Sequence, residues 1–151
     1  LALVGTPPAG DAYNPDGVWA DPADPAAVEG SLNGLLSTDF REAHPDALSR
    51  IAEWRLAEDA DREAYAAHRA AVESFDLTGA LFEVATPALV VHGTDDTVCP
   101  VTAGETLAEG LPRGEFHGVE GARHLVGVEA SAAVNDLLAG WLAEHASAAF
   151  E

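Results

Sequence analysis

The sequence predicts an α/β fold in which a small parallel sheet of about three strands is flanked by helices. Three apolar segments, residues 1–4, 88–92 and 115–119, are typical of buried strands. Helical patterns separate these segments along the chain, and strands that alternate with helices form parallel sheets. With 151 residues, 48% of them hydrophobic, the chain is long enough to build one core of this kind.

The first predicted strand, residues 1–4, is apolar throughout. A strand of this kind lies in the middle of a sheet, with both faces covered and a neighbour on each side. No other segment is an obvious partner for its far side, and an exposed apolar edge invites pairing with another chain. We therefore expect an N-terminal half that is missing from this chain, or a second copy in a homo-oligomer, to cover this edge.

A long insertion, residues 9–86, follows the first strand and far exceeds an ordinary crossover connection. Residues 10–25 are rich in proline, glycine and aspartate and predict an irregular loop. Helices are expected to begin at Asp24-Pro25, at His44-Pro45-Asp46 and at Asp61. The last two carry apolar or aromatic faces, which consist of Leu48, Ile51 and Trp54 in one helix and of Tyr65, His68, Val72 and Phe75 in the other.

We expect this insertion to form a helical cap over the carboxyl edge of the sheet. An apolar pocket beneath such a cap would be lined by some of its aromatic side chains. These are Tyr13, Trp19, Phe40, Trp54, Tyr65 and Phe75.

The remaining elements complete the sheet and its cover. A helix over residues 102–111 is expected between the second and third strands, and a closing helix over residues 129–145. The closing helix should pack on the sheet through side chains at helical spacing, namely Val134, Leu137, Leu138, Trp141 and Leu142. Residues 1–8 and 87–151 are thus expected to form the core, and residues 9–86 the cap.

The charge of the chain excludes several classes of partner. The chain has 26 acidic residues and 7 basic ones, all of them arginine, which gives a net charge of −19. Such a surface repels nucleic acid and anionic lipid, and no apolar run reaches membrane-spanning length, so we expect neither nucleic-acid nor membrane partners. The balance resembles proteins of salt-accumulating halophiles, although an acidic protein of a high-GC organism is the alternative.

Cys99 is the one cysteine, so no intrachain disulfide can form. This usage fits a reducing cytoplasm. Cys99 follows an acidic turn, where a reactive thiol is conceivable, but we expect a small buried hydrophobe.

Two side chains follow the second and third predicted strands and could carry chemistry. Asp95 and Asp96 form an acidic turn after Gly93, and His124 ends the loop that begins at Gly121. In a serine-hydrolase triad, a histidine transfers the proton of the serine, and a carboxylate fixes the tautomer of the histidine. We therefore expect His124 to be the base and Asp96 the acid, rather than an ordinary loop histidine and turn former.

The nucleophile of such a triad is missing from the sequence. It should precede the acid in a G-x-S-x-G turn between a strand and a helix. The nearest string, GSLNG at residues 30–34, places Ser31 directly after a glycine and within a helical pattern. We expect Ser31 not to be a nucleophile.

A metal site was the alternative interpretation of the same region. His92, Asp95, Asp96 and Cys99 are suitable ligands, but strand and turn geometry should splay their side chains. We therefore expect no metal and no cofactor. The other histidines are expected at a core or sheet-edge position, for His117, or in solvated helix positions, for His44, His68 and His145.

At these residues the chain resembles the C-terminal portion of the α/β-hydrolase family. Residues 1–8 are similar to the sixth strand and its exit, residues 87–100 to the seventh strand and acid turn, and residues 121–124 to the G-x-x-H loop of the base. In that family the acid is usually the third residue after the strand-end glycine, which is Asp96 here. The resemblance implies that the first five strands, the oxyanion hole and the nucleophile turn lie outside this chain.

A narrower similarity is to 3-oxoadipate enol-lactonases and their esterase-like relatives. It rests on residues 74–77 (SFDL), on His124-Leu125, and on Val128-Glu129 and Asn135. The chain departs from that pattern at Cys99, Arg123 and Ser131. The fold is therefore more firmly indicated than the substrate.

The resemblance implies a cofactor-free serine hydrolase that cleaves a small carboxylic ester or lactone, of which this chain is the C-terminal part and inactive alone. Related scaffolds carry haloperoxidases, carbon–carbon bond hydrolases and dehalogenases. The alternative is a non-catalytic interaction module that oligomerises through its open first strand.

Overall fold

The structure, a computed structural model, describes residues 1–146 and contains a three-stranded parallel sheet in the order β1-β2-β3. The strands are β1 (Ala2–Val4), β2 (Ala88–Gly93) and β3 (Gly114–Val119). Val90, in the central strand, pairs with Leu3 on one side and with Phe116 on the other. The predicted α/β fold with a parallel sheet is confirmed.

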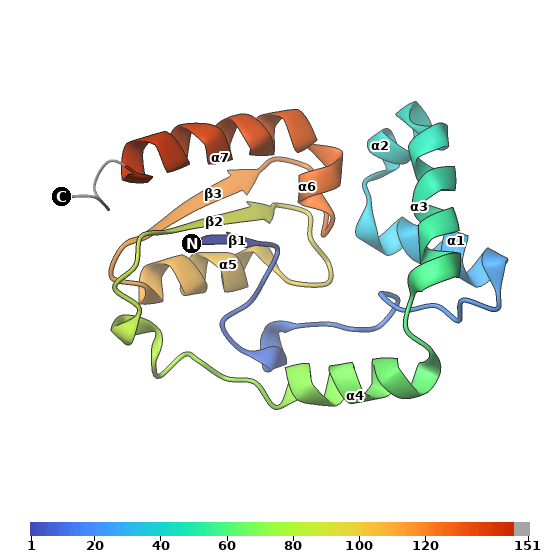
Figure 1. Cartoon of the computed structure of the whole chain (residues 1–151), viewed down its shortest axis with the longest axis horizontal. Helices are drawn as coiled ribbons and strands as arrows, with labels where there is room; N and C mark the ends of the chain where they lie inside the picture. The colour runs from blue at the N-terminus through green and yellow to red at the C-terminus, as the bar shows by residue number, and fades with distance from the viewer. Residues whose placement is uncertain (147–151) are drawn as a thin grey trace.

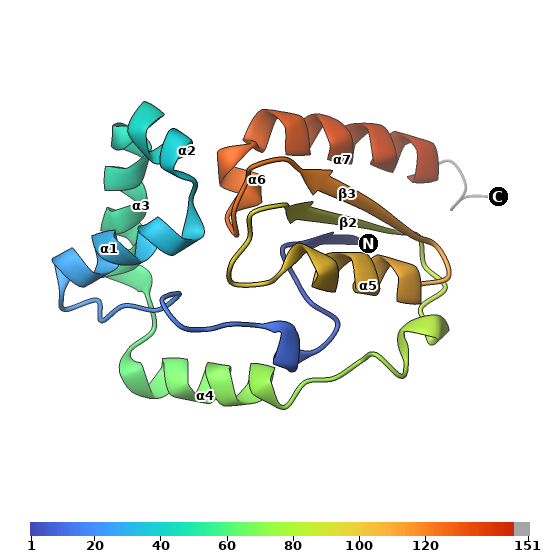
Figure 2. The same ribbon diagram turned by 180° about the vertical axis from the view of Figure 1, so that it is seen from behind.

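Helices cover both faces of the sheet (Figure 1). α5 (Val101–Gly110) lies on one face, and α6 (Val126–Glu129) and α7 (Ser131–Ala146) lie on the other, which Figure 2 shows from behind. Side chains of β2 alternate between the two covers, since Val90 belongs to the cluster under α5 and Val91 to the cluster under α7. All six residues of β2 are buried, which explains its continuous apolar run.

The closing helix begins two residues later than expected, because the short α6 precedes it. Val134 and Trp141 are buried against the sheet, and Leu137 and Leu138 pack beside them. Leu142 is 54% exposed, so its assignment to the buried face was wrong.

Within the described residues β1 is an edge strand. Leu1 is 51% and Val4 40% exposed, although the sequence predicts burial on both faces. Both strand edges of the described sheet are therefore open, one along β1 and one along β3.

Residues 9–86 fold into four helices and two short 3-10 turns. The helices are α1 (Pro25–Leu35), α2 (Thr38–Ala43), α3 (Pro45–Glu58) and α4 (Arg62–Glu73), and the turns are η1 (Gly10–Ala12) and η2 (Leu81–Glu83). Asp24 caps α1 by accepting the Ala27 N–H, and Asp61 caps α4 by accepting the Ala64 N–H. These caps are the signals that predict both helices.

α1, α2 and α3 share an apolar cluster of their own. Its buried members are Ala20, Val28, Leu32, Leu35, Leu36, Ala52 and Val98. Leu48 and Ile51 of α3 pack against it, but Trp54 is 59% exposed and does not belong to the packed face. Because Val98 comes from the loop after β2, the cluster joins the helical insertion to the carboxyl end of the sheet.

None of the helices in residues 1–146 is both long enough and apolar enough to cross a bilayer.

Candidate active site

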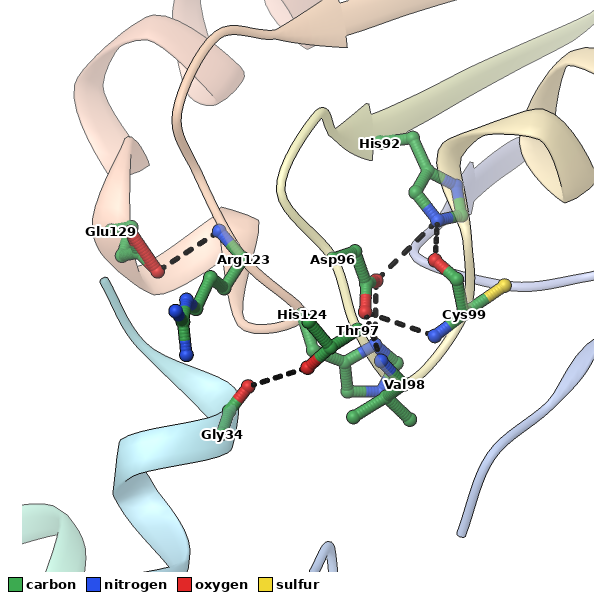
Figure 3. Close-up of polar contacts among 9 residues, drawn as sticks. All are labelled: Gly34, His92, Asp96, Thr97, Val98, Cys99, Arg123, His124 and Glu129. Carbon is green, nitrogen blue, oxygen red and sulfur yellow. Dashed lines mark hydrogen bonds and ion pairs between the residues drawn. The ribbon is translucent and has the colours of Figure 1, made fainter. Parts of the chain in front are cut away.

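Asp96 and His124 meet at the carboxyl end of the sheet, although 28 positions separate them in the sequence. Asp96 lies in the loop after β2, and His124 lies in the loop between β3 and α6. Nδ1 of His124 is 2.8 Å from Oδ2 of Asp96, a hydrogen-bonding distance (Figure 3). Asp95 is exposed, so Asp96 is the member of the acidic pair that faces the histidine.

The carboxylate of Asp96 is held by the turn in which it lies. Its side chain has no exposed surface. Oδ1 accepts the backbone N–H groups of Val98 at 2.8 Å and Cys99 at 2.9 Å. With Oδ1 tied to the turn, Oδ2 remains directed at His124.

A second histidine lies beneath the same carboxylate. His92, near the end of β2, is fully buried, and its Nε2 is 2.8 Å from the Cys99 carbonyl and 3.4 Å from Oδ2 of Asp96. Its Nδ1 has no hydrogen-bond partner and faces Gly104 of α5, where a Cβ would lie 2.5 Å away. From the sequence alone, His92 is considered only as a metal ligand. That it is a single polar residue within an apolar strand is the one sequence feature that indicates its contact with Asp96.

The two histidines control the charge of Asp96. Burial alone would raise the pKa of Asp96, but hydrogen bonds from His124, His92 and the Cys99 N–H outweigh it and hold the pKa well below its usual range. Burial and the unpartnered Nδ1 disfavour a charged His92, but the Asp96 carboxylate and the Cys99 carbonyl raise its pKa to about 10. Asp96 is therefore ionised at neutral pH and presents a negative charge to His124.

The loops that carry Asp96 and His124 are bonded to each other. The Asp95 N–H donates to the Ala122 carbonyl at 3.0 Å, and the Gly121 N–H donates to Oγ1 of Thr94 at 2.8 Å. Gly93 allows this contact, since a Cβ there would lie 2.3 Å from the Ala122 oxygen. The spacing of Asp96 and His124 is thus fixed by backbone contacts between their loops as well as by their own hydrogen bond.

The helical insertion is attached to the loop that carries His124. The Leu125 N–H donates to the Leu35 carbonyl at 3.0 Å. One carboxylate oxygen of Glu129 accepts both the Arg123 N–H, at 3.2 Å, and the Ser37 N–H, at 3.0 Å (Figure 3 shows the first of these). No local sequence pattern indicates these contacts of Glu129, because Ser37 lies 92 positions away in the sequence.

His124 lies between two apolar cavities. The larger, about 460 Å³, is lined by Val18, Trp19, Leu35, Ile51, Arg55, Asp59, Ala60, Tyr65, His124 and Leu125. The other, about 430 Å³, is lined by Gly5, Thr6, Pro7, Tyr13, Ala71, Val72, Phe75 and His124. Of the six aromatic residues considered for a pocket, Trp19 and Tyr65 line the first and Tyr13 and Phe75 the second.

Other candidate residues lie apart from this centre. Ser31 is part of α1, where its hydroxyl donates to the Val28 carbonyl at 2.6 Å. Cys99 is a buried free thiol that contributes only backbone groups to the acid turn. Among the described residues, no three histidine, cysteine or acidic side chains are placed to hold a metal ion.

The remaining histidines line neither of the two cavities. His44 and His68 are exposed, and His117 is exposed on the edge strand β3. His145 is not simply solvated as expected, because its ring stacks on Trp141 at 4.2 Å.

The arrangement of Asp96 and His124 is suited to proton transfer. A carboxylate on Nδ1 selects the tautomer that leaves a lone pair on Nε2, and it stabilises the imidazolium that forms when Nε2 takes a proton. His124 lines both cavities, so a group in either one can approach the ring.

The chain is similar in sequence to a known protein over a limited stretch. No family model matches the chain. A protein of Agrobacterium fabrum that is described as the carbamate hydrolase RutD is 39% identical over 59 residues, which are 39% of this chain and 23% of that protein.

Solved structures match over nearly the whole chain. The enol-lactonase from Burkholderia xenovorans superimposes with a TM-score of 0.75 and 24% identity, over 94% of this chain and 55% of that one. A thermophilic esterase from Thermogutta terrifontis gives a TM-score of 0.72 and 22% identity, over 96% of this chain and 56% of that one. The chain therefore spans about half the length of these two structures, and less of the carbamate hydrolase.

Proposed function

We propose that this chain, which has the fold of the C-terminal part of an α/β-hydrolase, supplies the acid and base of a cofactor-free serine hydrolase. The observation that carries the proposal is the 2.8 Å hydrogen bond between His124 and the fully buried, ionised Asp96. The reaction is cleavage of a small carboxylic ester or lactone by acyl transfer.

In this reaction each residue has one role. Nε2 of His124 takes the proton of a serine hydroxyl as the oxygen attacks the carbonyl carbon, and returns it to the leaving alkoxide. Asp96 holds the productive tautomer and stabilises the transient imidazolium. Water then attacks the acyl-enzyme by the same proton transfers and releases the acid.

The nucleophile comes from outside these 151 residues, since the sequence has no G-x-S-x-G turn. We infer that residues 1–8 and 87–151 belong to the catalytic core, and that residues 9–86 form the cap over it. The N-terminal half of the complete protein would then continue the sheet at β1. A cytoplasmic location fits the single buried thiol.

A non-catalytic interaction module is the second candidate. It is favoured by the open edge of β1, where Leu1 and Val4 are exposed. In this case a second copy would pair with β1, and the contact between Asp96 and His124 would only stabilise the loops.

The two candidates differ in the effect of His124→Ala on the complete protein. If His124 is the base, kcat/KM for a phenyl ester falls by about 10³-fold or more. His117→Ala is the matched control, because His117 is exposed on β3 and should leave kcat/KM within about twofold. Esterase activity that survives His124→Ala would exclude the proposed role.

A further inference from the structure

The larger cavity beside His124 is lined by one arginine, Arg55 of α3, and by one carboxylate, Asp59. The residues that line the smaller cavity include no arginine, aspartate or glutamate. Among the lining residues, a negative charge on a substrate in the larger cavity could therefore be matched only by Arg55.

The guanidinium of Arg55 is already bonded within the chain. Nε donates to Oδ2 of Asp59 at 2.8 Å, and one terminal nitrogen lies 2.8 Å from the same oxygen. That nitrogen also donates to the Val18 carbonyl at 2.8 Å, while the other donates to Oγ of Ser31 at 2.5 Å. Three of the five N–H groups thus make hydrogen bonds, and the positive charge is paired with the Asp59 carboxylate. The side chains of Arg55 and Asp59 are only 14% and 25% exposed, so their charges offset each other in a partly desolvated place.

The other polar side chains of this cavity are also occupied. Nε1 of Trp19 donates to the Ala60 carbonyl at 2.8 Å, and the Tyr65 hydroxyl donates to the Pro15 carbonyl at 3.1 Å. The two rings stack at 5.3 Å with an angle of 16° between their planes. The rings of Trp19 and Tyr65, together with Val18, Leu35 and Ile51, give this cavity an apolar lining. The guanidinium of Arg62 lies 5.1 Å from the centre of the Trp19 ring, but its side chain is 77% exposed and Arg62 does not line the cavity.

We propose that this cavity selects an uncharged, apolar ester or lactone and rejects a substrate that carries a second, free carboxylate. A carboxylate in the cavity would lose part of its hydration, meet the charge of Asp59 and find no unpaired cation among the lining residues. An apolar group of the same size meets no such penalty. This substrate class rests on the proposed function, since it assumes that His124 acts on the bound carbonyl.

Binding to the chain itself tests the proposal without any turnover. The probes are para-tolyl acetate and para-acetoxybenzoate. The first carries a methyl group on the ring at the position where the second carries a carboxylate. Each is titrated into the chain in about 1 M KCl, where a Debye length of about 3 Å screens the net charge of the surface. The indole N–H resonance of Trp19 reports binding in this cavity, and we expect the neutral probe to bind about tenfold more tightly or better.

Asp59→Asn removes the carboxylate that neutralises Arg55. It should tighten binding of para-acetoxybenzoate by about tenfold and change that of para-tolyl acetate by about twofold at most. Glu53→Gln is the matched control, since it removes one negative charge from an exposed position of α3, the helix that carries Arg55. It should leave the preference unchanged.

Equal binding of the two probes to the unchanged chain would overturn the proposal, and so would no response of Trp19 to either. A folded Asp59→Asn chain with an unaltered preference would also overturn the role of Arg55. The comparison in the unchanged chain stands even where this variant fails to fold. If the two probes bind equally and the ester turnover of the complete protein depends on His124, only the proposed substrate class is wrong. If the neutral probe binds more tightly but ester turnover survives His124→Ala, the proposed function is wrong instead.

Discussion

Asp96 accepts a hydrogen bond from His124 with one carboxylate oxygen and two backbone N–H groups with the other. Asp96 is thereby fixed by its own turn, and it orients a histidine that comes from a different loop. For this reason His124 can line both cavities while Asp96 stays buried. Four consequences can be measured.

The first concerns Gly93, which lets the two loops touch. In Gly93→Ala the new Cβ would lie 2.3 Å from the Ala122 oxygen and 2.5 Å from the Arg123 oxygen, both in the backbone. We expect the free energy of unfolding to fall by about 1–3 kcal/mol, as for other overpacked sites, measured by urea denaturation.

Gly30→Ala is the control for this experiment. Gly30 lies inside α1 with open space around its Cβ position, so alanine should raise the free energy of unfolding by about 0.5–1 kcal/mol. An equal loss of stability in both variants would contradict the account of Gly93.

The second consequence is a pH dependence that arises from His92. Its pKa is raised from 6.5 in the unfolded chain to about 10 in the folded protein, so between these values the folded state holds a proton that the unfolded state lacks. The stabilisation is complete below pH 6.5 and is lost as the pH rises toward 10. Denaturation midpoints should therefore fall across this window.

His92→Gln removes this titration while keeping an N–H donor near the Cys99 carbonyl. We expect a flatter dependence of unfolding free energy on pH in this variant between 6.5 and 10. His68→Gln, at an exposed position of α4, should keep the slope of the unchanged chain. Identical slopes in the unchanged chain and in His92→Gln would show that His92 does not take up a proton on folding.

The third consequence follows from the net charge of −19. Self-repulsion of the acidic surface is screened as the Debye length shrinks from about 10 Å at 0.1 M salt to about 3 Å at 1 M. We therefore expect the thermal unfolding midpoint to rise by several degrees with KCl over this range. An unchanged midpoint would contradict the halophilic interpretation, which stays a prediction.

Much of the fold could be predicted because its signals are local. The continuous apolar run of β2 predicts that the strand is buried on both faces. Asp24 and Asp61 indicate where the helices that they cap begin. The contact of Asp96 with His124 follows from their places after neighbouring parallel strands.

The remaining features depend on tertiary contacts that leave no pattern in the sequence. α2 has six residues, too few for a periodic signal, although Ser37 caps it by accepting the Phe40 N–H. Trp54 and Leu142 have the right spacing for a buried face, but no neighbouring element covers them within the described residues. The hydrogen bond from Arg55 to the Val18 carbonyl appears only when segments that are distant in the sequence come together.

The fourth and most direct test compares two adjacent carboxylates in the complete protein. Asp96→Asn should lower kcat/KM for an ester by about 10³–10⁴-fold, because the amide no longer holds the productive tautomer of His124. Asp95→Asn removes the same charge one position away, from an exposed side chain, and should change kcat/KM by about twofold at most. Equal losses in the two variants, or full activity in Asp96→Asn, would contradict the assignment of Asp96 as the acid of the site.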